Sequence, residues 1–271
     1  MTVRSTEQPK STLERPLHLL SFFSADSPEW TLSQLAKASG IPKPSCLRAL
    51  RALEAYGLLG KHDGRYRLGS KFLTLAAVMQ ENYPARHLAL PYLRQLRDAT
   101  DQSVQWVVRD NLDGIYLEVI APREPVTLYI NPGRRAPLYA GASTRLLLAF
   151  APPDVRRKVL TSRRRRYTEA TPVDARELRE ALARTQETWL ALSLGELQPS
   201  SAELAAPVFN ARHQLIAAIS VAGSETLYRQ RSTLMSYLPA LTETAQALSL
   251  ALGFAYRWQA DPDRFLRSVA L

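Results

Sequence analysis

Side chains that could carry out chemistry are few in this sequence and lie far apart. The four histidines are His18, His62, His87 and His213. They form no i, i+4 pair and have no carboxylate at a spacing that holds a metal ion. Ser143, in the sequence GAST, has no nearby histidine to activate it, so we interpret it as a helix cap or a ligand contact. Glu196 and Glu203 can be read as a carboxylate pair, but without another catalytic feature we expect no enzyme, no metal and no cofactor.

Cys46 is the only cysteine, which excludes a disulfide framework and a zinc ribbon. We expect it in a helix, at a position that tolerates a small and weakly polar side chain. A redox switch is the alternative interpretation.

A second group of side chains suits contact with phosphate. Lysine and arginine together number 35 against 25 for aspartate and glutamate, so the formal net charge is +10. A basic balance suits a polyanionic partner, although it carries no information on specificity. The candidate contacts are Lys43, Ser45, Arg48, Arg51, Arg65 and Arg67.

These candidates fall in residues 30–69, where the pattern predicts two short helices, a tight turn and a basic hairpin. Thr31 and Gln34 have the spacing of a capping box at the start of the first helix. Gly40 suits a left-handed position that ends this helix.

The second helix must start near its prolines, because Pro42 and Pro44 are tolerated only in a first turn. Its expected buried stripe consists of Leu47, Ala49, Leu50 and Leu53. The pair Asp63-Gly64 then predicts a hairpin turn. This order is typical of a winged helix-turn-helix, which places its second helix in the DNA major groove while the wing follows the phosphates. A small helical domain with a solvated basic face is the alternative.

The length of 271 residues suits two domains, each able to bury a core. We expect a disordered tail at 1–10, a DNA-binding domain at 11–69, a linker helix at 70–82, a second domain at 83–257 and a C-terminal tail at 258–271. The N-terminus lacks the apolar segment of a signal peptide, and no uninterrupted apolar stretch of 18 residues occurs. We therefore expect a soluble, cytoplasmic protein.

The second domain mixes strands and helices, which predicts an α+β fold with several helices covering one antiparallel sheet. Strands are expected at 103–109, 114–120, 126–130, 204–209 and 215–221. Helices are expected at 85–98, 143–150, 177–188 and 232–255. The last helix carries an apolar stripe of Leu234, Leu238, Leu241, Ala245, Leu248 and Leu252. We interpret this stripe as packing on the sheet, and a seam between subunits is the alternative.

Six segments carry a family pattern. In the first domain they are STLERPLHLLSFF, LSQLAKASGIPKPSCLRALRALEAYGLL and GRYRLGSKFLTLA, and in the second they are GRRAPLYAGASTRLLLAF, GELQPSSAELAAPVFN and LIAAISVAG. On these segments the chain, from about residue 11 to about residue 254, resembles the isocitrate lyase regulator (IclR) family of bacterial transcription factors. The resemblance implies a GAF-like effector-binding second domain, double-stranded operator DNA as a partner, and a dimer or a dimer of dimers.

The resemblance also places a small-molecule effector between the segment 140–145 and the strand 202–206. The residues expected to contact it are Tyr139, Ala140, Gly141, Ala142, Ser143, Glu203, Leu204, Ala205 and Ser220. Family members commonly have Gly-Lys where this chain has Thr144-Arg145, and Cys where it has Glu203.

A carboxylate at Glu203 would repel a carboxylate effector in a partly buried pocket. We therefore hypothesise a neutral sugar or polyol, or an amine-bearing effector, instead of a simple carboxylate. The alternative is that Glu203 is neutralised by Arg145 or Arg109, or points to solvent. The nearby aromatic residues Trp106, Tyr116, Tyr129 and Tyr139 either wall the ligand or belong to the core.

Together these features predict an effector-responsive, DNA-binding regulator of a catabolic or metabolic operon. Effector binding would shift the linker helix and with it the spacing of the two half-site helices in a dimer. Repression is the outcome expected by analogy, and activation is the alternative. A second class is a GAF-like ligand-binding or enzymatic protein whose basic first domain only anchors it. The arginine run 163–166 is expected to be a solvated loop, or else an extra DNA or partner contact.

Overall fold

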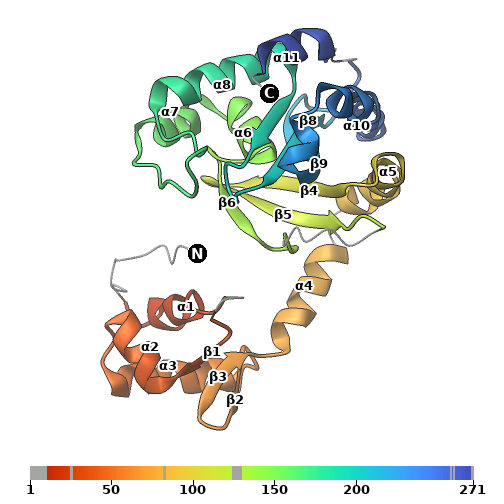
Figure 1. Cartoon of the computed structure of the whole chain (residues 1–271). Helices are drawn as coiled ribbons and strands as arrows, with labels where there is room; N and C mark the ends of the chain where they lie inside the picture. Colours follow the sequence, from red (N-terminus) through yellow and green to blue (C-terminus); the bar gives the residue numbers. More distant parts are fainter. Residues whose placement is uncertain are drawn as a thin grey trace. The chain divides into compact units, whose positions relative to one another are not determined.

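The computed structural model describes residues 11–24, 27–81, 84–123, 130–256, 258 and 260–269. The chain divides into two compact units, Met1–Tyr83 and Pro84–Leu271 (Figure 1). The expected tail at 1–10 and nearly all of the expected strand at 126–130, including Tyr129, lie outside the described residues. Helices and antiparallel strands occur in both units, as the predicted α+β class requires.

The first unit has the predicted order of helix, helix-turn-helix and hairpin. Its elements are α1 (Glu14–Leu20), β1 (Glu29–Thr31), α2 (Leu32–Ser39), α3 (Lys43–Ala55), β2 (Leu59–His62), β3 (Arg65–Leu68) and α4 (Lys71–Glu81). The short strand β1, which the sequence pattern did not predict, pairs with β3, so the sheet order is β1-β3-β2. This is the architecture of a winged helix-turn-helix.

Local signals set the ends of these elements. The capping box is present, because the Thr31 hydroxyl accepts a hydrogen bond from the Gln34 N–H at 3.3 Å and the Gln34 side chain accepts one from the Thr31 N–H at 2.9 Å. Gly40 ends α2 at a φ of 69°, and Pro42 caps α3. The hairpin turn follows from Asp63 and Gly64, which both have positive φ.

The core of the first unit corrects the expected stripe of α3. Cys46, Ala49, Leu50 and Leu53 are buried, whereas Leu47 is only half-buried. Cys46 is fully buried against the other apolar side chains of the unit, including Leu35 and Tyr66. Burial raises the pKa of the Cys46 thiol and so disfavours the reactive thiolate, which argues against the redox-switch interpretation.

The second unit is built on an antiparallel sheet. Within the described residues its six strands have the order β6-β5-β4-β9-β8-β7. They are β4 (Ser103–Asp110), β5 (Asp113–Ile120), β6 (Arg135–Pro137), β7 (Ala191–Leu194), β8 (Ser201–Phe209) and β9 (Leu215–Ser224). The helices are α5 (Pro84–Thr100), α6 (Ala142–Ala149), α7 (Pro153–Thr161), α8 (Ala175–Thr188), α9 (Glu225–Tyr228), α10 (Arg231–Ala251) and α11 (Pro262–Ser268).

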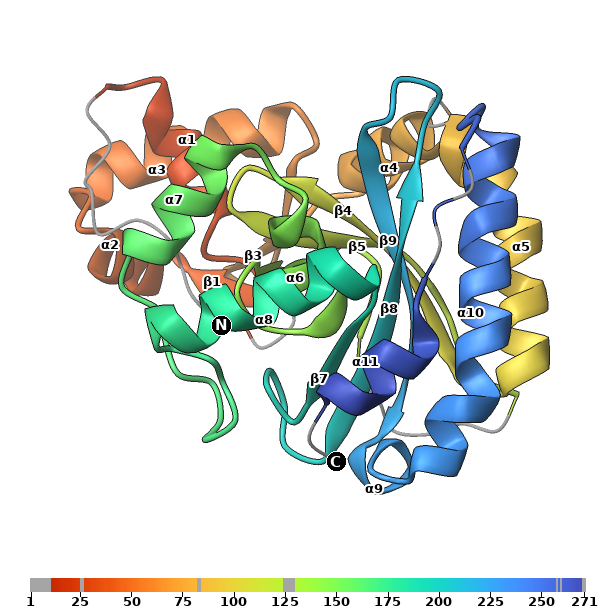
Figure 2. The same cartoon turned by 90° about the horizontal axis from the view of Figure 1, so that it is seen from above.

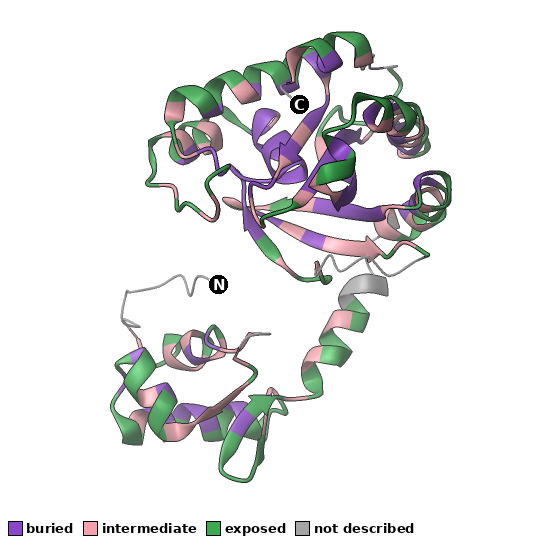
Figure 3. Cartoon of the chain, viewed as in Figure 1, coloured by how far each residue is buried: buried purple, intermediate pink, exposed green. Residues whose placement is uncertain are grey.

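Helices cover both faces of this sheet and create two cores. Figure 2 shows α5 and α10 against one face and α6 against the other. Every residue of α6 is buried, and Figure 3 shows the same for much of the central strands. The predicted stripe of α10 faces the sheet, since Leu234, Leu238, Leu241, Ala245 and Leu248 are buried in the core on that side.

Two boundaries differ from the sequence prediction. The last long helix ends at Ala251 instead of 255, and Gly253 follows it at a φ of 85°. The segment 258–271 is not merely a tail, because α11 forms within it and Phe265 and Leu266 are buried together with Trp258 in the core beneath α10. Short elements such as β6, β7, α7 and α9 also carry too weak a periodicity to be predicted.

Within the described residues, no helix has both the length and the apolar character needed to cross a membrane.

Candidate functional site

The outer face of α3 is the candidate DNA contact of the first unit. Arg48 and Arg51 are exposed and stand near the middle of this face, because successive helical residues are offset by about 100°. Exposed Lys43 and half-buried Ser45 lie towards its two edges. The Arg48 guanidinium donates to the Ser45 hydroxyl at 3.4 Å, which is a weak contact that an incoming phosphate or base could replace.

The wing contributes a second set of cations. Arg65 is exposed and forms no ion pair with any described residue. Arg67, by contrast, pairs with Glu29 at 3.0 Å across the β1–β3 ladder. Lys61, which the sequence analysis did not select, is held over the Tyr66 ring at 5.4 Å. Arg65 and Lys61 of the wing are therefore more available for contact with DNA phosphates than Arg67.

The second candidate site is the start of α6. Gly141 precedes the helix with a φ of 93°, a conformation that suits glycine. A Cβ on Gly141 would lie 2.9 Å from Leu197 Cδ1 and 3.4 Å from a carboxylate oxygen of Glu203. Thr144 anchors the same turn through a short hydrogen bond from its hydroxyl to the Ala140 carbonyl. A larger residue here would have to adopt a strained φ and displace the Leu197 side chain.

Two buried glutamates occupy the N–H groups at this helix start. The Gly141 N–H donates to Glu196 at 2.9 Å and the Ala142 N–H donates to Glu203 at 2.8 Å. The Ser143 hydroxyl donates to the second oxygen of Glu203 in a short hydrogen bond. A helix N-terminus favours negative charge, so each carboxylate takes the place that an anionic ligand would take.

Arg145 completes this arrangement from the next turn of α6. Its guanidinium forms an ion pair with Glu196 and donates to the Leu192 carbonyl, both at short distance. Arg145 and Glu196 are 6% and 8% exposed. A continuous set of polar contacts therefore runs from the Leu192 carbonyl of β7 to Arg145, from Arg145 to Glu196, and from Glu196 to the Gly141 N–H at the start of α6.

The alternatives for Glu203 are all wrong. Glu203 is 7% exposed and does not point to solvent. Arg145 pairs with Glu196 instead, and Arg109 donates to the Asn111 carbonyl at the surface. The N–H groups and the Ser143 hydroxyl at the helix start compensate the Glu203 charge, and Arg134 lines the same cavity.

A small cavity lies beside these glutamates. Its volume is about 30 Å³, and Tyr116, Arg134, Gly141, Leu197, Gln198 and Glu203 are among its lining residues. This volume holds one or two water molecules, not a metabolite. Burial, followed by the nearby charge of Glu203, raises the pKa of Tyr116 well above 10, so its phenol stays neutral at physiological pH.

The structure brings only part of the predicted effector set together. Ala205 and Ser220 are opposite each other on β8 and β9 and face α6, as Glu203 does, and Ser220 donates to the Gln105 side chain at 3.1 Å. Leu204 packs into the core on the other face of the sheet, because successive strand residues alternate.

Two of the aromatic residues are also placed away from the cavity. The Tyr139 hydroxyl donates to the Arg165 carbonyl at 3.0 Å and accepts from the Arg165 N–H at 2.8 Å, so it ties down the arginine run. Trp106 belongs to the core on the α10 side. Leu204 is therefore corrected to a core residue, whereas Tyr139 does not line the small cavity and its contact with an effector stays a prediction. Glu196 also belongs to the site and is absent from the predicted effector contacts; the signal that points to it in the sequence is its possible pairing with Glu203.

No group of three or more His, Cys, Asp or Glu side chains suited to a metal ion occurs in the described part of the chain. What the fold presents is a winged helix-turn-helix with a basic helix face, and a second domain with a small polar cavity. This combination is that of a DNA-binding domain joined to a second, separate α+β domain.

Comparison with known proteins gives the same result. Residues 5–63 match the IclR helix-turn-helix domain, and residues 78–250 match the bacterial transcriptional regulator IclR C-terminal domain. The chain therefore belongs to the IclR family of bacterial transcriptional regulators. Its relatives are regulators of transcription and not enzymes.

Three individual proteins illustrate the relationship. The HTH-type transcriptional regulator KipR of Bacillus subtilis (strain 168) is 32% identical over 243 residues, which cover 89% of this chain and 95% of KipR. The DNA-binding transcriptional repressor YiaJ of Escherichia coli (strain K12) is 27% identical over 91% of this chain and 89% of YiaJ. An IclR homolog from Microbacterium hydrocarbonoxydans, solved in complex with 4-hydroxybenzoate, shares the fold with a TM-score of 0.75 and 24% identity, over 89% of this chain and all of that one.

Proposed function

We propose that this chain is a homo-oligomeric repressor that releases its operator when a small molecule binds beside α6. The observation that carries the effector side of the proposal is the pair of buried carboxylates, Glu196 and Glu203, on the first N–H groups of α6. The repressor direction is supported by the relative YiaJ, which is a DNA-binding transcriptional repressor.

On the DNA side, the α3 face with Arg48 and Arg51 enters the major groove, and Arg65 and Lys61 hold the backbone from the wing. Lys43 and Ser45 contact the edges of the same groove. Arg67 joins only after leaving Glu29, so its contribution is smaller than that of Arg65.

Two-fold pairing is supported by apolar side chains that the first unit leaves exposed. Leu13 and Leu17 of the α1 region are 85% and 68% exposed, and Leu73 of α4 is 76% exposed. Large exposed leucines on one small domain favour burial against a second copy. A dimer also supplies two recognition helices, which one winged helix needs for useful specificity.

The proposed effector is a neutral hydroxylated molecule or an amine. The Gly141 and Ala142 N–H groups, the natural donors for a carboxylate, already bind Glu196 and Glu203. A carboxylate effector would have to displace one buried glutamate and face the other. A hydroxyl or ammonium group can instead donate to their remaining acceptor sites. An IclR homolog with the same fold was solved in complex with 4-hydroxybenzoate, so the proposal for this chain rests on its own side chains, Glu196 and Glu203, and not on the fold.

Because the cavity is only about 30 Å³, the effector must also move part of its wall. The candidate is the turn 195–200 between β7 and β8, which carries Glu196, Leu197 and Gln198. Movement of this turn changes the contacts of the α6 start, and the change in operator affinity follows from linkage between the two domains.

The DNA side is tested by selecting genomic fragments with the purified protein and measuring the affinity of the recovered site by fluorescence anisotropy. Arg48→Ala and Arg51→Ala should each weaken specific binding about 10- to 100-fold. Arg179→Ala, an exposed arginine on α8, is the matched control and should leave affinity unchanged. Equal affinity of all four proteins, or binding without sequence preference, would contradict the proposal.

The effector side is tested by calorimetry with glycerol, xylose and ethanolamine against pyruvate and succinate. Glu203→Gln keeps the acceptor for the Ala142 N–H and removes the charge, so it should weaken an amine and strengthen a carboxylate. A carboxylate that binds the wild type tightly and the Glu203→Gln variant weakly would overturn the assignment.

A further inference from the structure

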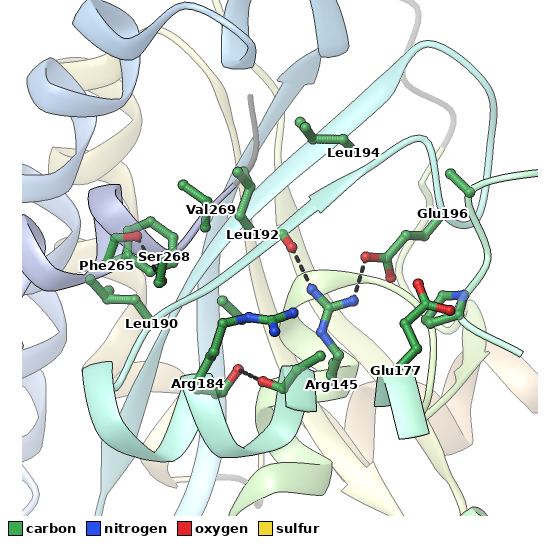
Figure 4. A pocket seen from close by; sticks show the side chains of 15 residues that line it. Arg145, Glu177, Arg184, Leu190, Leu192, Leu194, Glu196, Phe265, Ser268 and Val269 are labelled. Carbon is green, nitrogen blue, oxygen red and sulfur yellow. Dashed lines mark hydrogen bonds and ion pairs between the residues drawn. The ribbon is translucent and has the colours of Figure 1, made fainter. Parts of the chain in front are cut away.

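A larger pocket lies on the other side of the Arg145–Glu196 pair (Figure 4). Its volume is about 370 Å³, within the range of small-molecule sites. It is bounded by α8, β7 and α11, and it shares none of its lining residues with the small cavity beside Glu203. Arg145 and Glu196 line this pocket, whereas Gly141, whose N–H Glu196 binds, lines the small cavity.

The lining of this pocket has one charged end and one apolar end. Leu190, Leu192 and Phe265 supply apolar surface from β7 and α11. Arg145 stands at the charged end, and Figure 4 shows Arg184 extending towards it from α8. Glu177 and Glu196 line the pocket as well, and Glu196 already pairs with Arg145, so Arg184 is the lining cation left to attract an anion with an apolar body.

The charged end has donors that the protein leaves unused. A guanidinium has five N–H groups, and the described contacts of Arg145 are the Glu196 carboxylate and the Leu192 carbonyl. Its buried Nε has no hydrogen-bond partner among the described residues. Arg184, which is exposed, forms no ion pair with any described residue. Glu177, in the first turn of α8, also lines the pocket, and Figure 4 shows it beside Glu196, so a ligand that carries a second negative charge at that end is disfavoured.

We propose that this pocket is a second ligand site, which binds a small monocarboxylate with an apolar body. The carboxylate contacts the guanidinium groups of Arg145 and Arg184, and the apolar body packs on Leu190, Leu192 and Phe265. This binding does not depend on the proposed regulatory function.

The site is linked to the start of α6 by Glu196. One oxygen of Glu196 binds Arg145 and the other accepts from the Gly141 N–H. A carboxylate that takes Arg145 competes with Glu196, and the hold of Glu196 on the α6 start then weakens. Occupancy of the second site therefore alters binding in the cavity beside Glu203. This coupling, unlike the binding itself, rests on the proposed function.

The test uses benzoate as the probe and benzyl alcohol as its neutral counterpart, each titrated calorimetrically into the full-length protein. Benzoate should bind and benzyl alcohol should bind more weakly. Arg184→Gln should weaken benzoate about fivefold or more, and Ala181→Phe, which fills the pocket from α8, should abolish binding. Arg179→Gln makes the same charge change on α8 away from the pocket and should bind benzoate like the wild type.

The proposal is overturned if benzoate does not bind, or if its affinity is the same in Arg184→Gln and Ala181→Phe as in the wild type. Loss of benzoate binding in Glu203→Gln alone would assign the probe to the other cavity and would also overturn it. Operator binding is measured on the same preparations. Benzoate failure with normal operator binding rejects only the second site, whereas operator failure with normal benzoate binding rejects only the regulatory function.

Discussion

The helices α2 and α6 both begin with backbone N–H groups bound by side-chain oxygens, but these side chains lie at very different distances along the chain. At α2 the first N–H groups are satisfied by Thr31 and Gln34, three residues apart. At α6 the partners of Gly141 and Ala142 are 55 and 61 residues further along the sequence. The first unit is thus defined by local contacts, and the candidate effector site is defined by the sheet that brings β8 and the β7–β8 turn to α6.

The two starts also differ in what they can exchange with a ligand. The α2 cap is at the surface and is made by neutral side chains, so it acts only on helix stability. The α6 start is buried and holds two carboxylates and a guanidinium. Any ligand that alters this charge arrangement alters the packing of a helix in the middle of the domain.

The strongest way to break the α6 arrangement is Arg145→Met. It leaves the Glu196 charge buried without its cation, which should cost about 3–5 kcal/mol in the free energy of unfolding of the second unit. Urea denaturation followed by circular dichroism measures the loss, and the double variant with Glu196→Gln should recover much of it. The exposed control Arg179→Met should change stability by less than about 0.5 kcal/mol. A small effect of Arg145→Met would mean that the pair is dispensable.

Gly141→Ala tests the close approach at the same helix start. A positive φ and a Cβ 2.9 Å from Leu197 should together cost about 2–4 kcal/mol. Gly64→Ala in the wing is the counterpart in the first unit, where φ is also positive but no atom lies within 4 Å of the added Cβ, so strain alone should cost about 1–2 kcal/mol. Equal losses of unfolding free energy for the two substitutions would show that the side chains around Gly141 move aside for the added methyl group.

Alkaline pH should distinguish the second unit through its buried phenols. Burial, followed by the Glu203 charge, raises the pKa of Tyr116 well above 10, so the folded protein keeps a phenol that the unfolded chain ionises near pH 10. The stabilisation is complete below about pH 10 and is lost as pH rises from there towards the folded pKa, by about 1.4 kcal/mol per pH unit.

Tyr116→Phe should remove this share of the pH dependence, and the remaining slope is expected from Tyr228, whose pKa burial also raises well above 10. Denaturation curves recorded at intervals of about half a pH unit between about pH 9 and pH 11 give the free energy of unfolding, and its slope against pH measures this contribution. An unchanged slope in Tyr116→Phe would show that this phenol is ionised or exposed before unfolding.

The smallest expected effect belongs to the local cap. Thr31→Ala removes the hydroxyl that accepts from the Gln34 N–H and should cost the first unit about 1 kcal/mol, with no change in the second. Lys37→Ala, exposed on the same helix, should stay within about 0.5 kcal/mol of the wild type. A loss in the second unit would contradict the division into independently stabilised parts.

Much of the first unit follows from sequence because its signals are short-range. The capping pair Thr31 and Gln34, the turn at Gly40, the proline start of α3 and the Asp63-Gly64 hairpin all act within a few residues. Even here one residue was misplaced: Cys46, Ala49, Leu50 and Leu53 follow the i, i+3, i+4, i+7 spacing of one helix face, whereas Leu47 lies about 100° away from Cys46 around the helix and is only half-buried.

In the second unit the sequence determined the long strands, the stripe of α10 and the set of candidate residues near Gly141 and Glu203, because periodicity and residue type are written locally. It could not determine how these residues meet. Strand alternation turned Leu204 away from Glu203, the Arg165 backbone took the Tyr139 hydroxyl, and β7 brought Glu196 to Gly141. The charges of Glu196 and Glu203 are compensated at the start of α6 only because the sheet brings these distant residues there, and this juxtaposition is set by the tertiary structure.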